Sequence, residues 1–263
     1  MDKHGSWMML WAFKTIIHRL FMMKNGPFKA PNLRFSPPMI QIHPTLWAIE
    51  EPMPFGGLDI GARLLIVRRN DGSLWVHAPF SISDEDAAAI RALGEVRDVV
   101  VPNNFHYKEV GEFSRRFSGA QVWAPPKVAS KLKDVPHQPL EEIPTPWRED
   151  FDAILFQSRL FDEWVFCHRA SRTLILTDLA LNLPRPRTPL ARVVARIGDM
   201  GRGFKPSRLE RLMLRTGKLS EHKKRLETVL KWDFERITMA HGQIVESGGK
   251  TALRRGYRWL LGG

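Results

Sequence analysis

The sequence of 263 residues contains a single cysteine, Cys167. One cysteine cannot form an intramolecular disulfide or a zinc cluster of several thiolates, so any metal site must use His, Asp or Glu side chains. No stretch reaches about 18 consecutive uncharged apolar residues, the length that a transmembrane helix needs. No small-residue cleavage site follows the first apolar segment, so we also expect no secretory signal.

The chain also lacks the motifs that mark several common enzyme sites. It has no glycine-rich phosphate loop, no Gly-x-Ser-x-Gly, no His-Glu-x-x-His and no Cys-x-x-Cys, so nucleotide binding, serine hydrolysis and zincin chemistry have no support. Hydrophobic residues make up 43% and charged residues 26% of the chain, which is typical of a globular protein.

Acidic residues are the scarcer charge, with 28 Asp and Glu against 40 Lys and Arg and a net charge of +12. This excess favours an anionic partner, and we expect a small anionic ligand. Many basic residues lie in the C-terminal third, where no aromatic side chain is interleaved between 208 and 225. We interpret them as a solvated helix surface, which disfavours nucleic acid. They are Arg192, Arg196, Arg202, Lys205, Arg208, Arg211, Arg215, Lys218, Lys223, Lys224 and Arg225.

Residues 1–38 form a separate segment that holds six basic residues and one acid. Apolar residues recur there at helical spacing, interrupted by Lys14, His18 and Arg19: Trp7, Leu10, Trp11, Ile16, Ile17, Leu20 and Phe21. Such a helix either lies on an anionic membrane surface or docks its apolar stripe on the body of the protein. The proline-rich run 27–38 predicts a linker. We therefore expect a cytoplasmic protein, with peripheral membrane contact through residues 1–38 as one option.

Residues 39–263 are predicted to form one α/β domain. Short β-rich runs over 40–42, 46–49, 62–67 and 74–77 predict an antiparallel meander, followed by an α/β stretch with strands at 96–101 and 120–123 and helices at 87–93, 108–117 and 125–132. A second β block covers 151–178, with a hairpin around 168–172. Helices follow at 190–197, 207–215, 220–230 and 250–261, with one strand at 237–240. This order fits an αββα sandwich, two sheets with helices on both outer faces.

Three polar residues stand where predicted strands end. His106 follows the strand at 96–101, Asp178 closes the strand that starts at Thr173, and His241 follows Ile237-Thr-Met-Ala. Because α/β enzymes gather functional groups at the carboxyl ends of strands, we expect these three side chains to converge at one end of the domain.

These motifs together resemble a known superfamily. The strand followed by Pro-Asn-x-x-His, the run Phe166-Cys-His-Arg-Ala-Ser-Arg-Thr-Leu-Ile-Leu-Thr-Asp178 and Ala240-His-Gly242 before a C-terminal helix are similar to an uncharacterised family, a domain of unknown function, within the metallo-β-lactamase superfamily. The resemblance runs from about Met39 to the C-terminus. It implies the αββα sandwich, with a site at one edge between the two sheets.

The first loop of this sequence departs from the H-x-H-x-D-H pattern of active members. Asn103, Phe105, Tyr107 and Lys108 stand where His, His, Asp and His are expected, and His106 is displaced. The resemblance assigns Asp178 as the bridging Asp and His241 as the final His, and no middle His precedes the 151–178 hairpin. A phenylalanine cannot ligate and a lysine repels cations, so we do not expect the usual two-zinc site.

For a pocket of Asn103, His106, Tyr107, Lys108, Asp178 and His241 we expect the first of the following two functions and keep the second as the alternative. In the first, the metal site is degenerate, Lys108 pairs with Asp178, and the domain is a non-catalytic or weakly active relative that binds an anionic ligand. In the second, His106, Asp178 and His241 hold one zinc, manganese or iron ion in a metal-dependent hydrolase. The cofactor is accordingly none or one divalent transition metal.

Other polar residues have local interpretations. His106, Asp178 and His241 could also do no more than satisfy nearby backbone groups. Tyr107 beside Lys108 could serve acid–base chemistry, but a packed phenol is the commoner arrangement. We interpret His77 at a strand end, and His168, Arg169 and Arg172 in the hairpin turn, as local hydrogen-bonding residues.

Overall fold

The computed structural model describes residues 39–55, 57–201 and 203–262. The predictions made for residues 1–38 lie outside the described residues and stay predictions, as does the domain boundary at residue 38. No helix within the described ranges is long and apolar enough to cross a membrane.

In the part of the chain that the structure describes, the first sheet has seven strands in the order β1-β2-β5-β6-β7-β8-β9. The β1-β2-β5-β6 half is antiparallel, as the meander predicted, and β7, β8 and β9 then continue parallel to β6. The strands are β1 (Ile40–His43), β2 (Leu46–Glu51), β5 (Ala62–Arg68), β6 (Leu74–His77), β7 (Val96–Val100), β8 (Gln121–Ala124) and β9 (Gln138–Pro139).

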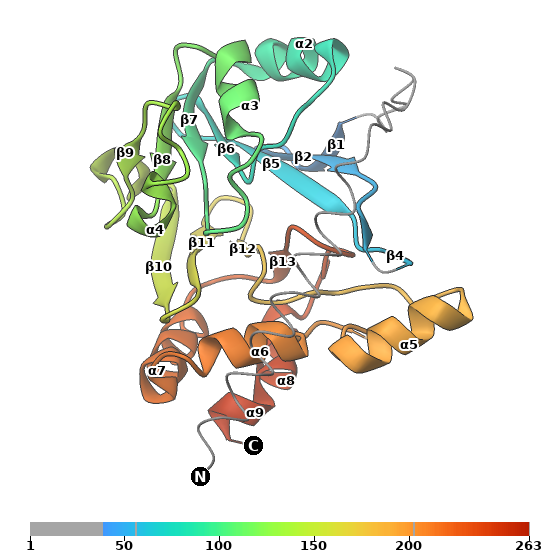
Figure 1. The fold of residues 1–263 in the computed structure, drawn as a ribbon. Helices are drawn as coiled ribbons and strands as arrows, with labels where there is room; N and C mark the ends of the chain where they lie inside the picture. The colour runs from blue at the N-terminus through green and yellow to red at the C-terminus, as the bar shows by residue number, and fades with distance from the viewer. Residues whose placement is uncertain (1–38, 56, 202, 263) are drawn as a thin grey trace.

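Three helices cover the outer face of this sheet: α2 (Asp84–Leu93), α3 (Val110–Arg116) and α4 (Pro126–Ala129). Helix α2 begins at the predicted cap, because the Ser83 side chain accepts a hydrogen bond from the Asp86 backbone N–H. Ile90, Phe113 and Val128 from the three helices share one buried cluster with Ile66 and Val99 of the sheet. This cluster joins the first two layers of the fold (Figure 1).

The second sheet has four strands within the described residues, in the order β10-β11-β12-β13. The first three strands are antiparallel, and β13 runs parallel to β12. The 168–172 turn joins β11 to β12 as the sequence predicted. The strands are β10 (Phe151–Gln157), β11 (Asp162–His168), β12 (Thr173–Ile175) and β13 (Arg236–Thr238).

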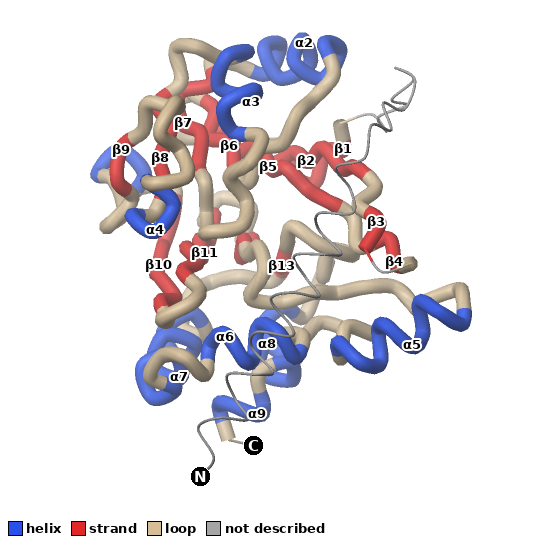
Figure 2. The backbone as a smooth tube through the Cα atoms, viewed as in Figure 1, coloured by secondary structure: helices blue, strands red, loops and turns tan. Residues whose placement is uncertain are grey.

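Alternation along the strands explains why the two sheets stack. On β11, Trp164 and Phe166 point into a cluster shared with Trp75 and Phe151 between the sheets, whereas Val165 on the same strand faces the outer helices. The outer helices are α6 (Arg208–Leu214), α7 (Leu219–Val229), α8 (Gly249–Gly256) and α9 (Arg258–Leu261). The order helix, sheet, sheet, helix is visible from top to bottom in Figure 2. The predicted αββα sandwich is confirmed.

Helix α5 (Pro189–Gly198) extends from the side of the sandwich (Figure 1). Its Ala191 and Ala195 pack on Leu58 of a small hairpin made of β3 (Pro54–Phe55) and β4 (Leu58–Asp59). This hairpin was not predicted from the sequence, because strands of two residues are too short to show alternating polar and apolar side chains.

The closing helix predicted over 250–261 is interrupted at Tyr257. The Tyr257 ring is buried, and its hydroxyl donates a hydrogen bond to the Leu179 carbonyl oxygen (2.5 Å). Anchoring this side chain in the core separates α8 from α9. The helix predicted over 125–132 is shorter than expected and forms the single turn of α4.

Candidate metal centre

The three polar residues predicted at strand ends meet at one edge of the sandwich. His106 lies in the loop between β7 and α3, Asp178 follows β12, and His241 follows β13. One potential ligand atom from each residue lies within 4.8 Å of the other two. All three side chains are largely buried.

Asp178 is the centre of the group. Its Oδ1 atom lies 3.2 Å from His106 Nε2 and 3.3 Å from His241 Nε2. Burial opposes ionisation of this carboxyl, but the charges and hydrogen bonds of His106 and His241 outweigh it and hold the pKa of Asp178 far below its usual value. For His106, burial opposes protonation, whereas Asp178 and, less strongly, Glu163 raise the imidazole pKa above its usual value. The centre therefore keeps an ionised carboxylate between two imidazoles.

A backbone carbonyl group fixes the orientation of the His241 ring. Its Nδ1 donates a hydrogen bond to the Gly61 carbonyl oxygen (2.6 Å), so Nε2 faces Asp178. Arg63 then binds the carbonyl oxygens of Met239 and Gly242, which flank the histidine at either end. The loop that carries His241 is therefore tied to strand β5.

Asn103 organises the loop that carries His106. Its Oδ1 accepts hydrogen bonds from the backbone N–H groups of Phe105 and His106, both at 2.9 Å. Its Nδ2 donates to Asp178 Oδ2 (2.8 Å) and Thr177 Oγ1 (3.0 Å). Asn103, which stands at the expected first ligand position, therefore joins the His106 loop to the Asp178 loop by hydrogen bonds.

Glu163 is a residue of this site that the sequence analysis missed. It is completely buried, and its carboxylate accepts hydrogen bonds from the backbone N–H groups of Thr177, Asp178 and Leu179 and from Asn103 Nδ2. Burial, followed by the nearby charge of Asp178, raises the pKa of Glu163 to about 7. The signal in the sequence is weak: Glu163 is the second of two carboxylates at the start of a strand whose middle is apolar.

The structure does not bring Lys108 and Tyr107 into the centre. Lys108 is exposed, which does not fit the proposed pair of Lys108 with Asp178, and the imidazoles of His106 and His241 lie against the Asp178 carboxylate instead. Tyr107 packs against the core cluster of the first sheet, with Lys131 Nζ 4.6 Å from its ring centroid. The turn at Asn103 directs His106 inward and the following residues outward. Tyr107 is therefore a packing residue, as its commoner interpretation holds.

A family model described as "Domain of unknown function (DUF4336)" matches residues 43–197. The chain belongs to this family. The matched range contains Asn103, His106, Glu163 and Asp178, whereas His241 lies beyond it. No curated protein matches the chain.

Solved structures similar to this DUF4336 member are metallo-β-lactamases. A metallo-β-lactamase from Pontibacter korlensis aligns with a TM-score of 0.54 and 12% identity, over 86% of this chain and 99% of the other. The FIM-1 enzyme from Pseudomonas aeruginosa, solved in a mono-zinc form, aligns with a TM-score of 0.51 and 13% identity over 85% and 92%. TMB-1 aligns with a TM-score of 0.54 and 13% identity over 84% and 95%. These likenesses show that the chain has the fold that the resemblance implied.

The remaining histidines singled out from the sequence are structural in this DUF4336 protein. His77 is fully buried and stacks on Trp75 with ring centroids 5.3 Å apart, and its Nε2 has no hydrogen-bond partner among the described residues, so its interpretation as a local hydrogen-bonding residue is not confirmed. Burial, and secondarily the charge of His106, lowers the pKa of His77 to about 3. His168 Nδ1 lies 2.8 Å from Ser171 Oγ. Neither belongs to the group formed by His106, Asp178 and His241.

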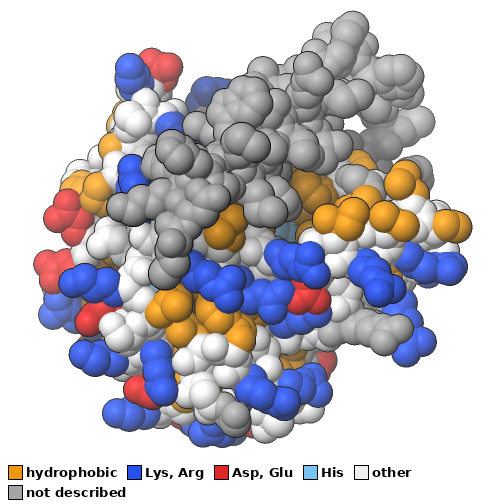
Figure 3. All heavy atoms as spheres, turned by 60° about the horizontal axis from the view of Figure 1, so that its bottom comes forward, with side chains coloured by type: hydrophobic (Ala, Val, Ile, Leu, Met, Phe, Trp, Pro, Cys, Tyr) orange, Lys and Arg blue, Asp and Glu red, His pale blue; other side chains and the backbone are white. Residues whose placement is uncertain are grey.

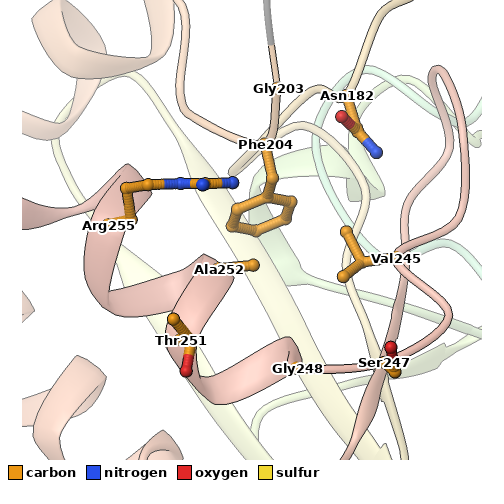
Figure 4. A pocket seen from close by; sticks show the side chains of 9 residues that line it. All are labelled: Asn182, Gly203, Phe204, Val245, Ser247, Gly248, Thr251, Ala252 and Arg255. Atoms are coloured by element: carbon orange, nitrogen blue, oxygen red, sulfur yellow. The ribbon is translucent and has the colours of Figure 1, made fainter.

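A surface hollow of about 470 Å³ lies beside the His241 loop rather than at the metal centre. Figure 4 shows its lining, in which Gly248 lies at the start of α8 and the Arg255 side chain, in the last turn of the helix, extends toward the Phe204 ring. The backbone N–H of Gly248 at that helix start already donates to the Glu235 carboxylate. None of the three candidate metal ligands lines this hollow.

Proposed function

We propose that His106, Asp178 and His241 hold one divalent transition metal and that the protein is a single-metal hydrolase. The observation that carries this proposal is the convergence of two imidazole nitrogens and one carboxylate oxygen within 4.8 Å, from three different loops. Two His and one carboxylate form a common ligand set for zinc, manganese or iron with positions left open.

The surroundings of the three side chains fit such an ion. The hydrogen bond from His241 to Gly61 fixes the tautomer that leaves Nε2 as a ligand, and Asn103 fixes the orientation of Asp178. Lys108, whose ammonium would repel a cation, is exposed instead of buried in the centre. The three donor atoms are therefore already close together in the described structure.

A bound ion of this kind supplies Lewis acidity, which polarises a substrate oxygen and lowers the pKa of water. The protein side chains and backbone keep the proposed ligands in place. Glu163 accepts hydrogen bonds from three consecutive backbone N–H groups, those of residues 177 to 179, and so fixes the loop that carries Asp178. The net charge of +12 favours an anionic ester or phosphodiester as substrate.

A second candidate is a metal-free domain that binds an anionic ligand. The two imidazoles satisfy Asp178 directly, at 3.2 and 3.3 Å, and the raised pKa of His106, for which burial is outweighed by Asp178, favours a cation there. In this alternative His106, rather than the exposed Lys108, is the anchor for the anion.

Metal titration distinguishes the two. Full-length protein stripped with a chelator is titrated with zinc by calorimetry, and we expect one equivalent to bind. Asp178→Ala and His241→Ala should each weaken binding by at least about 100-fold, because each removes a ligand. His137→Ala, a histidine whose Nδ1 contacts the Val135 carbonyl oxygen, is the matched control and should bind zinc like the wild type.

Hydrolysis is then measured with p-nitrophenyl acetate, a chromogenic β-lactam and bis-p-nitrophenyl phosphate. Activity that disappears on chelation and returns with one equivalent of metal supports the hydrolase. Absence of stoichiometric binding of zinc, manganese and iron would exclude it and favour the metal-free candidate.

A further inference from the structure

Helix α5 presents an apolar stripe to solvent. Leu190, Val193 and Ile197 are 65%, 54% and 58% exposed and recur at i, i+3 and i+7, so they share one face of the helix. Ala191 and Ala195 face the other way and pack on Leu58. The inner face already anchors α5 to the body, and the stripe is surplus to that packing.

Arginines surround this stripe, and acids are absent from the segment. Between residues 179 and 198 the sequence has four arginines and no Asp or Glu, and all four are exposed: Arg185, Arg187, Arg192 and Arg196. The next acid along the chain, Asp199, is neutralised by Lys205 and Arg211. In Figure 3 hydrophobic side chains gather at the right of the face shown, where α5 lies, with Lys and Arg side chains next to them.

We propose that α5 and the arginines that precede it form a docking surface for an anionic lipid bilayer. At about 100° per residue, Arg196 borders the stripe, about 60° from Val193, and Arg192 lies further round the helix on the same side, so the apolar side chains can enter the acyl boundary while the guanidinium groups reach the headgroups. Each basic residue near an anionic bilayer adds to the attraction. The charge pattern and the apolar stripe therefore select the same occupant.

A second copy of this chain fits the surface less well. A two-fold symmetric contact places the same patch against itself, so the arginines of one copy would meet those of the other. Like charges facing one another oppose association. An anionic bilayer offers both an apolar layer and a negative surface.

Sedimentation of full-length protein with vesicles tests the proposal. We expect binding to phosphatidylcholine mixed with phosphatidylglycerol, little binding to phosphatidylcholine alone, and a decrease at high salt. The triple variant Leu190→Gln, Val193→Gln, Ile197→Gln should lower the partition coefficient by at least about tenfold. A similar loss is expected for glutamine at the four arginines of the segment.

The matched control replaces four exposed cations on other helices or their caps with glutamine: Arg208, Lys218, Lys224 and Arg254. This variant loses the same net charge, and it should keep at least half of the wild-type binding if α5 is the contact. Circular dichroism verifies that each variant is folded.

A fluorophore then reports where the bilayer touches the protein. The native Cys167 is completely buried, so an environment-sensitive probe labels Val193→Cys selectively, and Lys224→Cys on α7 serves as the reference site. We expect a blue shift at position 193 with anionic vesicles and none at position 224.

Several outcomes overturn the proposal. One is an absence of vesicle binding by the full-length protein, and another is binding that leaves the probe at position 193 in water, which assigns the contact to a different part of the chain. If the arginine variant and the control variant lost vesicle binding equally, the binding would depend on net charge alone and not on α5. A change from dimer to monomer in the triple variant, without an effect on vesicle binding, would assign the stripe to a second copy.

Discussion

Replacing Arg63 with methionine should loosen the loop that carries His241. Arg63 is 6% exposed, and its guanidinium group binds the carbonyl oxygens of Met239 and Gly242 as well as the Glu50 carboxylate. Methionine keeps much of the apolar stem but offers no donor. Both carbonyl groups lose their charged partner at once.

The size of the effect follows from those two carbonyl oxygens. A hydrogen bond from a charged donor contributes about 1.5 to 3 kcal/mol, and an unsatisfied buried acceptor costs a similar amount. Glu50 is 36% exposed, so the loss of its ion pair adds little. We expect the free energy of unfolding to fall by about 3 to 4 kcal/mol. Zinc affinity should fall about 10- to 100-fold, because Arg63 orients the loop of a ligand.

Urea unfolding of chelator-treated protein and zinc calorimetry measure the two effects separately. Arg63→Lys should be intermediate, since one ammonium cannot reproduce the fork that reaches both carbonyl oxygens. Arg97→Met is the control: Arg97 is 53% exposed and pairs at the surface with Glu95 and Asp71, so stability should change by less than about 0.5 kcal/mol. If Arg63→Met matched the control in both assays, the bracing of His241 by Arg63 would be refuted.

Three further predictions concern the body of the fold. Gly242→Ala should destabilise the protein by at least about 2 kcal/mol in urea unfolding, because φ is +89° and a Cβ would lie 2.4 Å from the Asn182 carbonyl oxygen, whereas Gly119→Ala should be neutral. Burial, with a smaller effect of His43, lowers the pKa of His168 to about 4 from 6.5, so stability should fall by up to about 3 kcal/mol as the pH drops between those values; His168→Phe should reduce this loss. Burial raises the pKa of Glu210 from 4.5 to about 7, so its contribution is present below pH 4.5 and lost as the pH rises to 7; Glu210→Gln should flatten that decline. Unfolding curves across the pH range that are parallel for wild type and variant would contradict the last two.

The convergence of His106, Asp178 and His241 could be predicted because each follows a strand. Apolar runs in the sequence predicted strands β7 and β12. Strands β12 and β13 are parallel neighbours, so the loop after β12 and the loop after β13 leave the sheet at the same edge. Ser83 as a helix cap and the 168–172 turn were equally local signals. Local patterns and strand direction sufficed for these features.

Features that depend on distant pairing could not be predicted. Glu163 reads as part of an apolar strand, and only the bridge between Asn103 and Glu163 shows that its carboxylate serves the Asp178 loop. An ungapped comparison with the superfamily motif placed Lys108 in the centre, but the hydrogen bonds of Asn103 to its own loop turn the chain before that residue. The position of Lys108 in the motif therefore did not predict its position in space.

The hydrogen bonding of Asp178 favours the proposed site for one ion over a site in which both oxygens of Asp178 bridge two ions. A carboxylate that bridges two metals in the bidentate mode uses both oxygens. Here Oδ2 accepts a hydrogen bond from Asn103 Nδ2 at 2.8 Å, and both imidazoles approach Oδ1. By the resemblance, Asn103 stands where active members of the superfamily have their first histidine ligand. An asparagine at this position removes one ligand from the first loop, and its Nδ2 donates a hydrogen bond to the second oxygen of Asp178. In the proposed site, Oδ1 and the two histidines would supply three ligands, which is the number that a catalytic zinc site with an open position uses.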